Sequence, residues 1–250
     1  MELWQLAILS GTGLIAGFLN VMAGGGSLLT VPIMVFMGVP GPVANGTNRI
    51  AILAQNIAAV TAFFRRGHAD FRLSLSLAAC ALPGAVAGAL LGVTLDGVWF
   101  NRVLALIMVG VLLVMALGGD RKRTGRSAAP GRRQLLWGHL CMVGVGLYGG
   151  FIQLGVGFII MPVLHRVMGL DLVSTNMHKV FIVMTYTIVA LIIFANQIDI
   201  LWIAGVSMAI GNATGAWIAA HVQIEKGEGV INGVLNTVLV LFIVKLLFFP

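Results

Sequence analysis

The sequence has few charged residues, and no carboxylate falls deep inside a long apolar run. Only 9% of its 250 residues are charged, whereas 59% are hydrophobic. A soluble domain carries roughly 25% charged residues. Mean hydropathy is +1.03, and the apolar runs are long enough to cross a bilayer core of about 30 Å. The composition therefore excludes a soluble globular protein and indicates an integral membrane protein.

Other absences narrow the function further. The two cysteines, Cys80 and Cys141, both lie in apolar segments, so we expect no disulfide framework. The N-terminal segment lacks the basic region and cleavage site of a secretory signal, so we expect it to be retained. The five histidines show no ligand spacing, and the run GGGS lacks the lysine of a phosphate-binding loop. We therefore expect no metal site and no cofactor.

The net charge of +7 is concentrated in loops. One polar loop holds six cations, namely Arg121, Lys122, Arg123, Arg126, Arg132 and Arg133. Short cytoplasmic loops of membrane proteins are enriched in Lys and Arg, and such loops also attract anionic lipid. This loop is therefore predicted to be cytoplasmic, and nucleic acid is not expected as a partner.

Hydrophobic runs and polar breaks predict eight segments, near 5–37, 43–64, 71–95, 98–118, 135–168, 172–195, 200–220 and 229–249. Two of them, 5–37 and 135–168, are too long for one simple span. Each is interrupted by glycines and then by a proline. We predict that each is a broken helix made of two shorter pieces.

Similar residues recur about 130 positions apart, which predicts an internal duplication. The matches include Pro32 with Pro162, Asn45 with Asn176, and Gly84 and Gly88 with Gly211 and Gly215. Glycines one turn apart allow close contact between membrane helices. The predicted organisation is a first repeat over 1–118, a basic cytoplasmic linker over 119–134 and a second repeat over 135–250. The predicted fold is an all-α polytopic membrane protein of two four-segment repeats, each opening with a broken helix.

Loop charge bears on how the two repeats are oriented. The loop with Arg65, Arg66 and Arg72 is basic, whereas its counterpart at 195–200 has no Lys or Arg. If basic loops are cytoplasmic, the two loops lie on opposite sides of the membrane. This favours inverted repeats, with parallel repeats as the alternative.

Two cations inside predicted spans are the leading site candidates, because ionisable groups in a membrane are costly. Arg49 and Lys179 occupy corresponding regions of the two halves. By helical period, each belongs to a polar stripe, the first holding Asn45, Asn48, Arg49, Gln55 and Asn56, the second Asn176, Lys179, Tyr186 and Thr187. Cations and amides without a carboxylate suit an anion. The alternative is that both cations extend to the interface.

The glycine breaks have a physical role in the same hypothesis. A broken membrane helix frees backbone N–H groups, which need partners in protein or in a water-filled cavity. The helix that restarts after Gly24, Gly25 and Gly26 presents a positive N-terminal end. Ser27 either caps this helix or contacts the substrate. In the second half, Gln153 and the backbone near Gly155 would contribute the corresponding contacts to the substrate. Broken helices in corresponding positions of two repeats typically mark a transporter site.

The runs GLIAGFLNVMAGGGSLLTVPIMVFMGVPGPVANGTNRIAIL and GFIIMPVLHRVMGLDLVSTNMHKVFI resemble the sulfite exporter TauE/SafE family of membrane permeases. The resemblance implies movement of sulfite, sulfonates or related anions, usually across a bacterial cytoplasmic (inner) membrane. Its motif residues map onto Gly24, Gly25, Gly26, Ser27, Pro32, Asn45, Thr47 and Asn176. The full candidate substrate-binding set is Gly24, Gly25, Gly26, Ser27, Asn45, Thr47, Asn48, Arg49, Gln153, Asn176, His178 and Lys179.

The predicted function is a non-enzymatic secondary transporter of a small sulfur-containing anion. Export is the expected direction, because an inside-negative potential favours anion exit by about 2.3 kcal/mol per charge per 100 mV. A passive anion channel is the nearest alternative. An intramembrane hydrolase with Ser27 as nucleophile and His178 as base lacks a G-x-S-x-G elbow. The expected partners are the anion and the bilayer; protons as coupling ion through His178 and a homodimer are left open.

Overall fold

A computed structural model describes residues 2–67, 70–95, 97–100, 102–103, 106, 110 and 130–226. Within these ranges the regular structure is helical and no strand occurs. The elements are α1 (Leu3–Met22), α2 (Ser27–Phe36), α3 (Gly41–Arg65), α4 (Phe71–Thr94), α6 (Arg132–Phe151), α7 (Gly157–Pro162), a π-helical turn (Val163–Val167), α8 (Leu172–Gln197) and α9 (Trp202–Lys226).

The predicted all-α membrane fold is confirmed. Four described helices, α1, α4, α8 and α9, are long and apolar enough to cross a membrane. The predicted span 43–64 corresponds to α3, whose polar stripe lowers its hydropathy. The predicted span 229–249, most of 98–118 and most of the linker 119–134 lie outside the described residues.

Both predicted broken helices are present. The first is interrupted between α1 and α2, where Gly24 has a φ of +84°. The second is interrupted between α6 and α7, where Gln153 and Gly155 have φ values of 61° and 65°. Glycine adopts positive φ without steric cost, so it suits a sharp turn inside the bilayer. After the first turn the chain doubles back, and Gly26 packs against the backbone of Ala16 on α1.

The two halves interlock through close contacts between glycines and neighbouring backbones. Gly84 and Gly88 of α4 pack on the carbonyls of Val143 and Leu147 of α6. In the same way Gly211 and Gly215 of α9 pack on the carbonyls of Ser10 and Leu14 of α1. The predicted small-residue contacts are therefore confirmed, and each joins the third long helix of one half to the first helix of the other.

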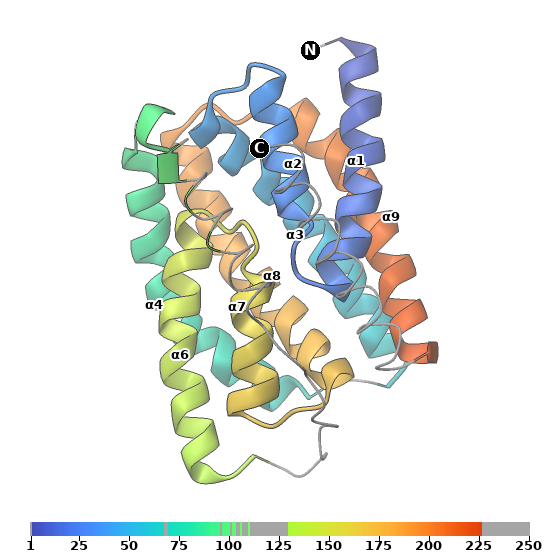
Figure 1. Ribbon diagram of the computed structural model, residues 1–250, viewed down its shortest axis with the longest axis vertical. Helices are drawn as coiled ribbons and strands as arrows, with labels where there is room; N and C mark the ends of the chain where they lie inside the picture. Colours follow the sequence, from blue (N-terminus) through green and yellow to red (C-terminus); the bar gives the residue numbers. More distant parts are fainter. Residues whose placement is uncertain are drawn as a thin grey trace.

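The register of these contacts sets the helix directions. Contacts advance together along α1 and α9, and along α4 and α6, so each pair is parallel. In Figure 1, α1 descends from the marked N-terminus, whereas α6 ascends from the opposite end. The opening helices of the two halves therefore run in opposite directions, and their breaks lie near the middle of the bundle (Figure 1).

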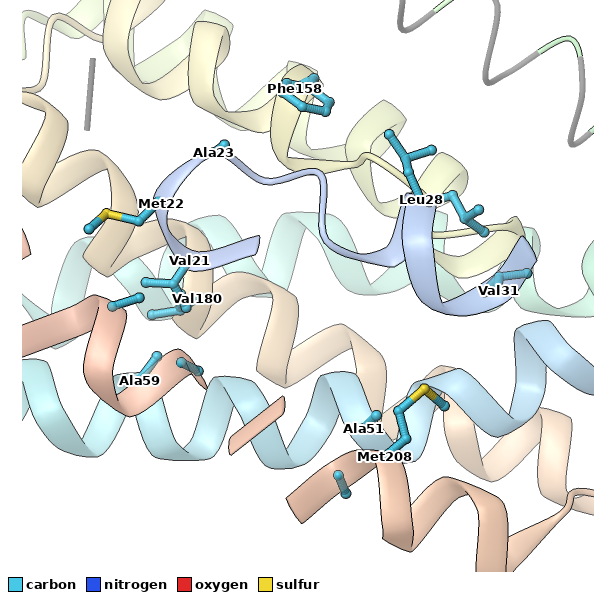
Figure 2. Close-up of a cluster of buried hydrophobic side chains, with 14 of the residues drawn as sticks. Val21, Met22, Ala23, Leu28, Val31, Ala51, Ala59, Phe158, Val180 and Met208 are labelled. Carbon is cyan, nitrogen blue, oxygen red and sulfur yellow. The ribbon is translucent and has the colours of Figure 1, made fainter. Parts of the chain in front are cut away.

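The main apolar core surrounds these breaks. Figure 2 shows side chains from both broken segments packed with side chains of the long helices. They include Val21, Met22, Ala23, Leu28, Val31, Ala51, Ala59, Phe158, Val180 and Met208, all of them buried. The irregular backbone is thereby covered by protein, as its hydrogen-bonding groups require at membrane depth.

Arginines collect at one end of the bundle. Arg65, Arg66 and Arg72 flank the connection between α3 and α4, and Arg132 and Arg133 begin α6 at the same end (Figure 1). The His139 ring of α6 lies 3.0 Å from the hydroxyl of Ser76 on α4, one to two turns from these cations. The described part of the basic linker therefore lies at the same end as the basic α3–α4 connection.

Candidate functional site

The two breaks meet in the interior. The backbones of Gly24 and Gly157 touch, so neither position has room for a Cβ atom. A Cβ on Gly25 would lie 2.6 Å from the ring of Phe158. The N–H of Gly155 donates to Ser27 Oγ at 3.3 Å. Corresponding parts of the two halves therefore form one junction, which includes the predicted residues Gly24, Gly25, Gly26 and Ser27.

Lys179 caps the broken end of α1. Its Nζ donates to the carbonyl oxygens of Asn20 at 3.0 Å and Val21 at 2.8 Å. These carbonyls belong to the last turn of α1, where the helix dipole is negative, and Asn20 O also accepts from the N–H of Gly24 at 2.9 Å. Only 3% of Lys179 is exposed, so this cation does not extend to the interface.

Arg49 caps the broken end of α6 in the same manner. Its Nη1 donates to Gly149 O at 3.1 Å, and its Nη2 donates to Gly150 O at 2.5 Å and Phe151 O at 3.3 Å. The guanidinium also lies 4.3 Å from the centre of the Phe194 ring. Arg49 is completely buried, so the interface alternative does not describe it either.

The two caps are reciprocal. Arg49 lies on α3 of the first half and holds the broken helix of the second half. Lys179 lies on α8 of the second half and holds the broken helix of the first half. Carbonyls and a helix C-terminus stabilise each cation, because hydrogen bonds to charged groups are stronger than neutral ones. The two halves are thus joined at the centre through charge-assisted bonds.

A narrow pocket lies beside this junction. Its polar lining comes from both halves and consists of Asn20, Ser27, Gln55, Asn56, Gln153 and Lys179. The cavity itself is small, about 10 Å³, which is about the space that one water molecule needs. Among the described residues, Lys179 is the one charged side chain in the lining, and no carboxylate lines it. A single cation surrounded by amides and a hydroxyl suits a small anion.

Three predicted site residues, Ser27, Gln153 and Lys179, line this pocket. Gln153 accepts from Arg49 at 3.1 Å and donates to Thr187 at 2.9 Å. Ser27 was expected to cap α2 or to contact the substrate. The N-cap of α2 is Gly26, so the capping prediction is wrong. Because Ser27 Oγ accepts from Gly155, its own O–H is left to donate.

The remaining predicted residues form contacts between helices away from the pocket lining. Asn45 Nδ2 donates to Phe151 O at 2.9 Å, beside Arg49. Thr47 Oγ1 accepts from Leu201 N at 3.1 Å, and Asn48 Oδ1 accepts from Thr30 Oγ1 at 2.8 Å. Asn176 Nδ2 donates to Gln223 Oε1 at 2.9 Å, and His178 Nδ1 lies 2.8 Å from Ser74 Oγ. Their participation in substrate binding stays a prediction.

Three polar lining residues, Asn20, Gln55 and Asn56, were not in the candidate set. Gln55 and Asn56 follow Arg49 on the predicted polar stripe of α3, and that periodicity was the signal that could have selected them. Asn20 lies one turn before the glycine break. Its polarity so close to the break could have indicated a place in the pocket lining, since the last turn of a broken membrane helix needs polar partners from protein or from a water-filled cavity.

Replacement of Arg49 by lysine tests the cap on α6. One ammonium cannot reproduce the planar fork that contacts three consecutive carbonyls. We expect the free energy of unfolding to fall by about 3 kcal/mol, seen as a lower melting temperature of the purified protein in detergent. The matched control is Arg72→Lys at an exposed position, for which no change is expected. Equal melting temperatures for both variants would contradict the cap.

The fold and the junction define a class, namely multi-pass α-helical membrane proteins with two broken helices that meet at a central polar pocket. Comparison with known families narrows this class. The family model described as "Sulfite exporter TauE/SafE" matches residues 9–246. The chain therefore belongs to the TauE/SafE family of membrane permeases, and its broad functional class is membrane transporter.

Curated relatives agree with this assignment. The chain is 28% identical to a "Probable membrane transporter protein ORF9" of Sinorhizobium sp, over 98% of this chain and 93% of that protein. It is 28% identical to a "Probable membrane transporter protein" of Haemophilus influenzae, over 91% and 88%. It is 25% identical to the "Probable membrane transporter protein YfcA" of Escherichia coli K12, over 97% and 90%. No solved structure matches the chain significantly.

Proposed function

We propose that this protein is a secondary transporter that exports a small sulfur-containing anion, such as sulfite or a sulfonate, through the pocket between its halves. The observation that carries the proposal is the position of Lys179, a buried cation in a pocket where two broken helices meet and which no carboxylate of the described residues lines. The family name supports the choice of a sulfur-containing anion.

Lys179 is the residue that would hold the anion. An ammonium has three N–H donors, and two of them are used on Asn20 O and Val21 O. The remaining donor has a weak acceptor, since Nζ lies 4.0 Å from Met161 Sδ. An oxyanion oxygen is a far stronger acceptor than a thioether. Ser27, at the start of α2, adds a hydroxyl donor to the lining of the same pocket.

Arg49 has a different role in this proposal. Its guanidinium does not line the pocket, and its Nη atoms are bonded to the end of α6 and to Gln153. We assign it to holding α6 and orienting Gln153, which does line the pocket. The earlier prediction that Arg49 itself contacts the anion is left to experiment.

Alternating access would follow from inverted repeats that move against each other around a fixed site. Opposite directions of α1 and α6 support inversion, and the reciprocal caps provide corresponding contacts in each half. The repeats 1–118 and 135–250 remain the proposed moving units. Because the caps cross between halves, we propose that binding of an anion at Lys179 weakens its hold on α1 and permits this movement.

The charge distribution supports a location in the bacterial cytoplasmic membrane with the arginine-rich end inside. Short basic loops remain cytoplasmic, and the α3–α4 connection with Arg65, Arg66 and Arg72 is such a loop. In this orientation an anion that leaves the cell moves down the inside-negative potential, which favours exit by about 2.3 kcal/mol per charge per 100 mV. The membrane potential can therefore drive the export of an anion.

Flux measurements in liposomes test the proposal. Purified protein should carry sulfite and sulfoacetate faster than protein-free liposomes do, with saturable kinetics and mutual competition. The zwitterion taurine, which has no net charge, tests whether the pocket requires a net negative charge, and sulfate tests whether it accepts a fourth oxygen on the sulfur. Outward flux should rise with an inside-negative potential, and an imposed pH gradient tests coupling to protons. Flux that does not saturate would favour a channel, and no anion flux at all would contradict the proposal.

A further inference from the structure

We propose that Asn20 and Asn212 orient Gln55 so that its amide nitrogen faces the pocket and supplies a second donor to the bound anion. The inference rests on the proposed function, because it concerns the same pocket. It assigns Gln55 as a residue that contacts the substrate and Asn212 as a positioning residue that acts through it. Neither belongs to the set of candidates selected from the sequence.

The hydrogen bonds fix the orientation of Gln55. Its Oε1 accepts from Asn20 Nδ2 at 3.1 Å and from Asn212 Nδ2 at 3.4 Å. A carboxamide carries its oxygen and its NH₂ group on opposite sides of the same planar group. With two donors on the oxygen, the NH₂ group is directed to the other side. Gln55 lines the pocket and is only 2% exposed, so its Nε2 donors are available there.

The three amides come from three different helices. Asn20 lies in the last turn of α1, Gln55 lies on α3 and Asn212 lies on α9. Asn212 is completely buried and does not line the pocket. It lies at the close α1–α9 contact, where a Cβ on Gly13 would lie 3.2 Å from its side-chain oxygen. Its side-chain amide donates to Gln55, and we assign its influence on the anion to that bond.

Two donors from separate helices select for shape as well as charge. Lys179 and Gln55 lie on α8 and α3, so one anion uses both donors only if it presents two acceptor atoms in different directions. Sulfite and sulfonate groups each have three oxygens, whereas chloride is a single sphere. A site built to bond a polar group rejects a ligand that leaves its donor unpaired. The geometry thus points to discrimination between oxyanions and halides.

Variants of Gln55 and Asn212 test the inference in liposomes that carry sulfite or chloride. Gln55→Glu replaces the donor by an acceptor of like charge to the anion, and we expect the KM for sulfite to rise about 100-fold. Gln55→Met removes the donor without adding charge, and Asn212→Leu removes its support; each should raise KM about tenfold with turnover unchanged. In all three the preference for sulfite over chloride should fall.

The control is Asn196→Asp. Asn196 is exposed, and its amide donates to Ile192 O of its own helix. This variant should retain the parent KM for sulfite and the parent sulfite-to-chloride ratio. If Gln55→Glu does not fold, the KM and the sulfite-to-chloride ratio of Gln55→Met and Asn212→Leu still test the inference. A parent KM and a parent sulfite-to-chloride ratio in folded Gln55→Met and Asn212→Leu would overturn the inference. An unchanged KM for sulfite in folded Gln55→Glu would also overturn it, because a carboxylate in contact with the anion would repel it. Absence of anion flux in the parent would instead contradict the proposed function.

Discussion

Replacement of Lys179 by methionine is expected to raise the KM for sulfite flux by about 10- to 100-fold, since a hydrogen bond to a charged group is worth about 1.5–3 kcal/mol. Methionine retains much of the length of the buried side chain but has neither the charge nor the donors. The pocket would then hold amides and a hydroxyl without a cation. The measurement is the concentration dependence of sulfite flux into or out of liposomes.

Two further variants show whether an effect on KM is specific to the charge at Lys179. Arg72→Gln removes an exposed cation at the arginine-rich end and should leave KM at the parent value. Lys179→Arg retains the charge but places a larger planar group among Asn20, Val21 and Met161, and we expect it to recover only part of the affinity. A folded Lys179→Met protein with the kinetics of the parent would show that the anion does not bind at Lys179.

Replacement of Gly24 by alanine is expected to cause the largest loss of stability. The residue has a φ of +84°, and its Cβ would be forced against the backbone of Gly157. Strain at such a φ costs about 1–2 kcal/mol, and overpacking adds about 1–3 kcal/mol. Since neither backbone can move without shifting a broken helix, we expect a much lower melting temperature and loss of flux.

Gly38→Ala separates the two costs. Gly38 has a φ of +86°, nearly the same as Gly24, but an added Cβ there would meet nothing within 4 Å. This variant should therefore show the conformational cost alone and keep its flux. If Gly24→Ala and Gly38→Ala have equal melting temperatures, the breaks do not touch as described.

The broken helices could be predicted because their signals are local. Gly24 to Gly26 in the first half, and Gly155 with Gly157 in the second, are each followed by a proline, a pattern that is incompatible with an uninterrupted span. The contacts of Gly84 and Gly211 were also accessible, because small residues one turn apart have few other uses in a membrane helix. Both features depend on residues close together in the chain.

The roles of the polar stripe could not be predicted in this way. Periodicity placed Asn48, Arg49 and Gln55 on one face of α3, but neighbours on one face need not share a partner. Asn48 bonds Thr30, Arg49 bonds the end of α6, and Gln55 bonds Asn20 and Asn212. Residues 45 and 56 are separated by about 16 Å along the helix. Over that distance one face of α3 contacts several different helices.

The reciprocal caps by Arg49 and Lys179 could not be predicted from the sequence, for a related reason. Arg49 and Lys179 were paired as equivalents in the two halves, and an interior position was favoured over the interface; both side chains are buried. Their acceptors, however, are backbone carbonyls, which have no signature in the sequence. Arg49 contacts carbonyls about 100 positions away, and Lys179 contacts carbonyls about 160 positions away. Only the packing of the two halves brings these groups together.

The central claim is that two equivalent cations have different tasks, Lys179 to bind the anion and Arg49 to hold α6. Calorimetric titration of sulfite into purified parent, Lys179→Met and Arg49→Lys proteins in detergent tests it most directly. The account predicts saturable binding to the parent, loss of binding in Lys179→Met, and retained binding in folded Arg49→Lys despite its lower melting temperature. Binding that survives in Lys179→Met, or that is lost in Arg49→Lys alone, would contradict it.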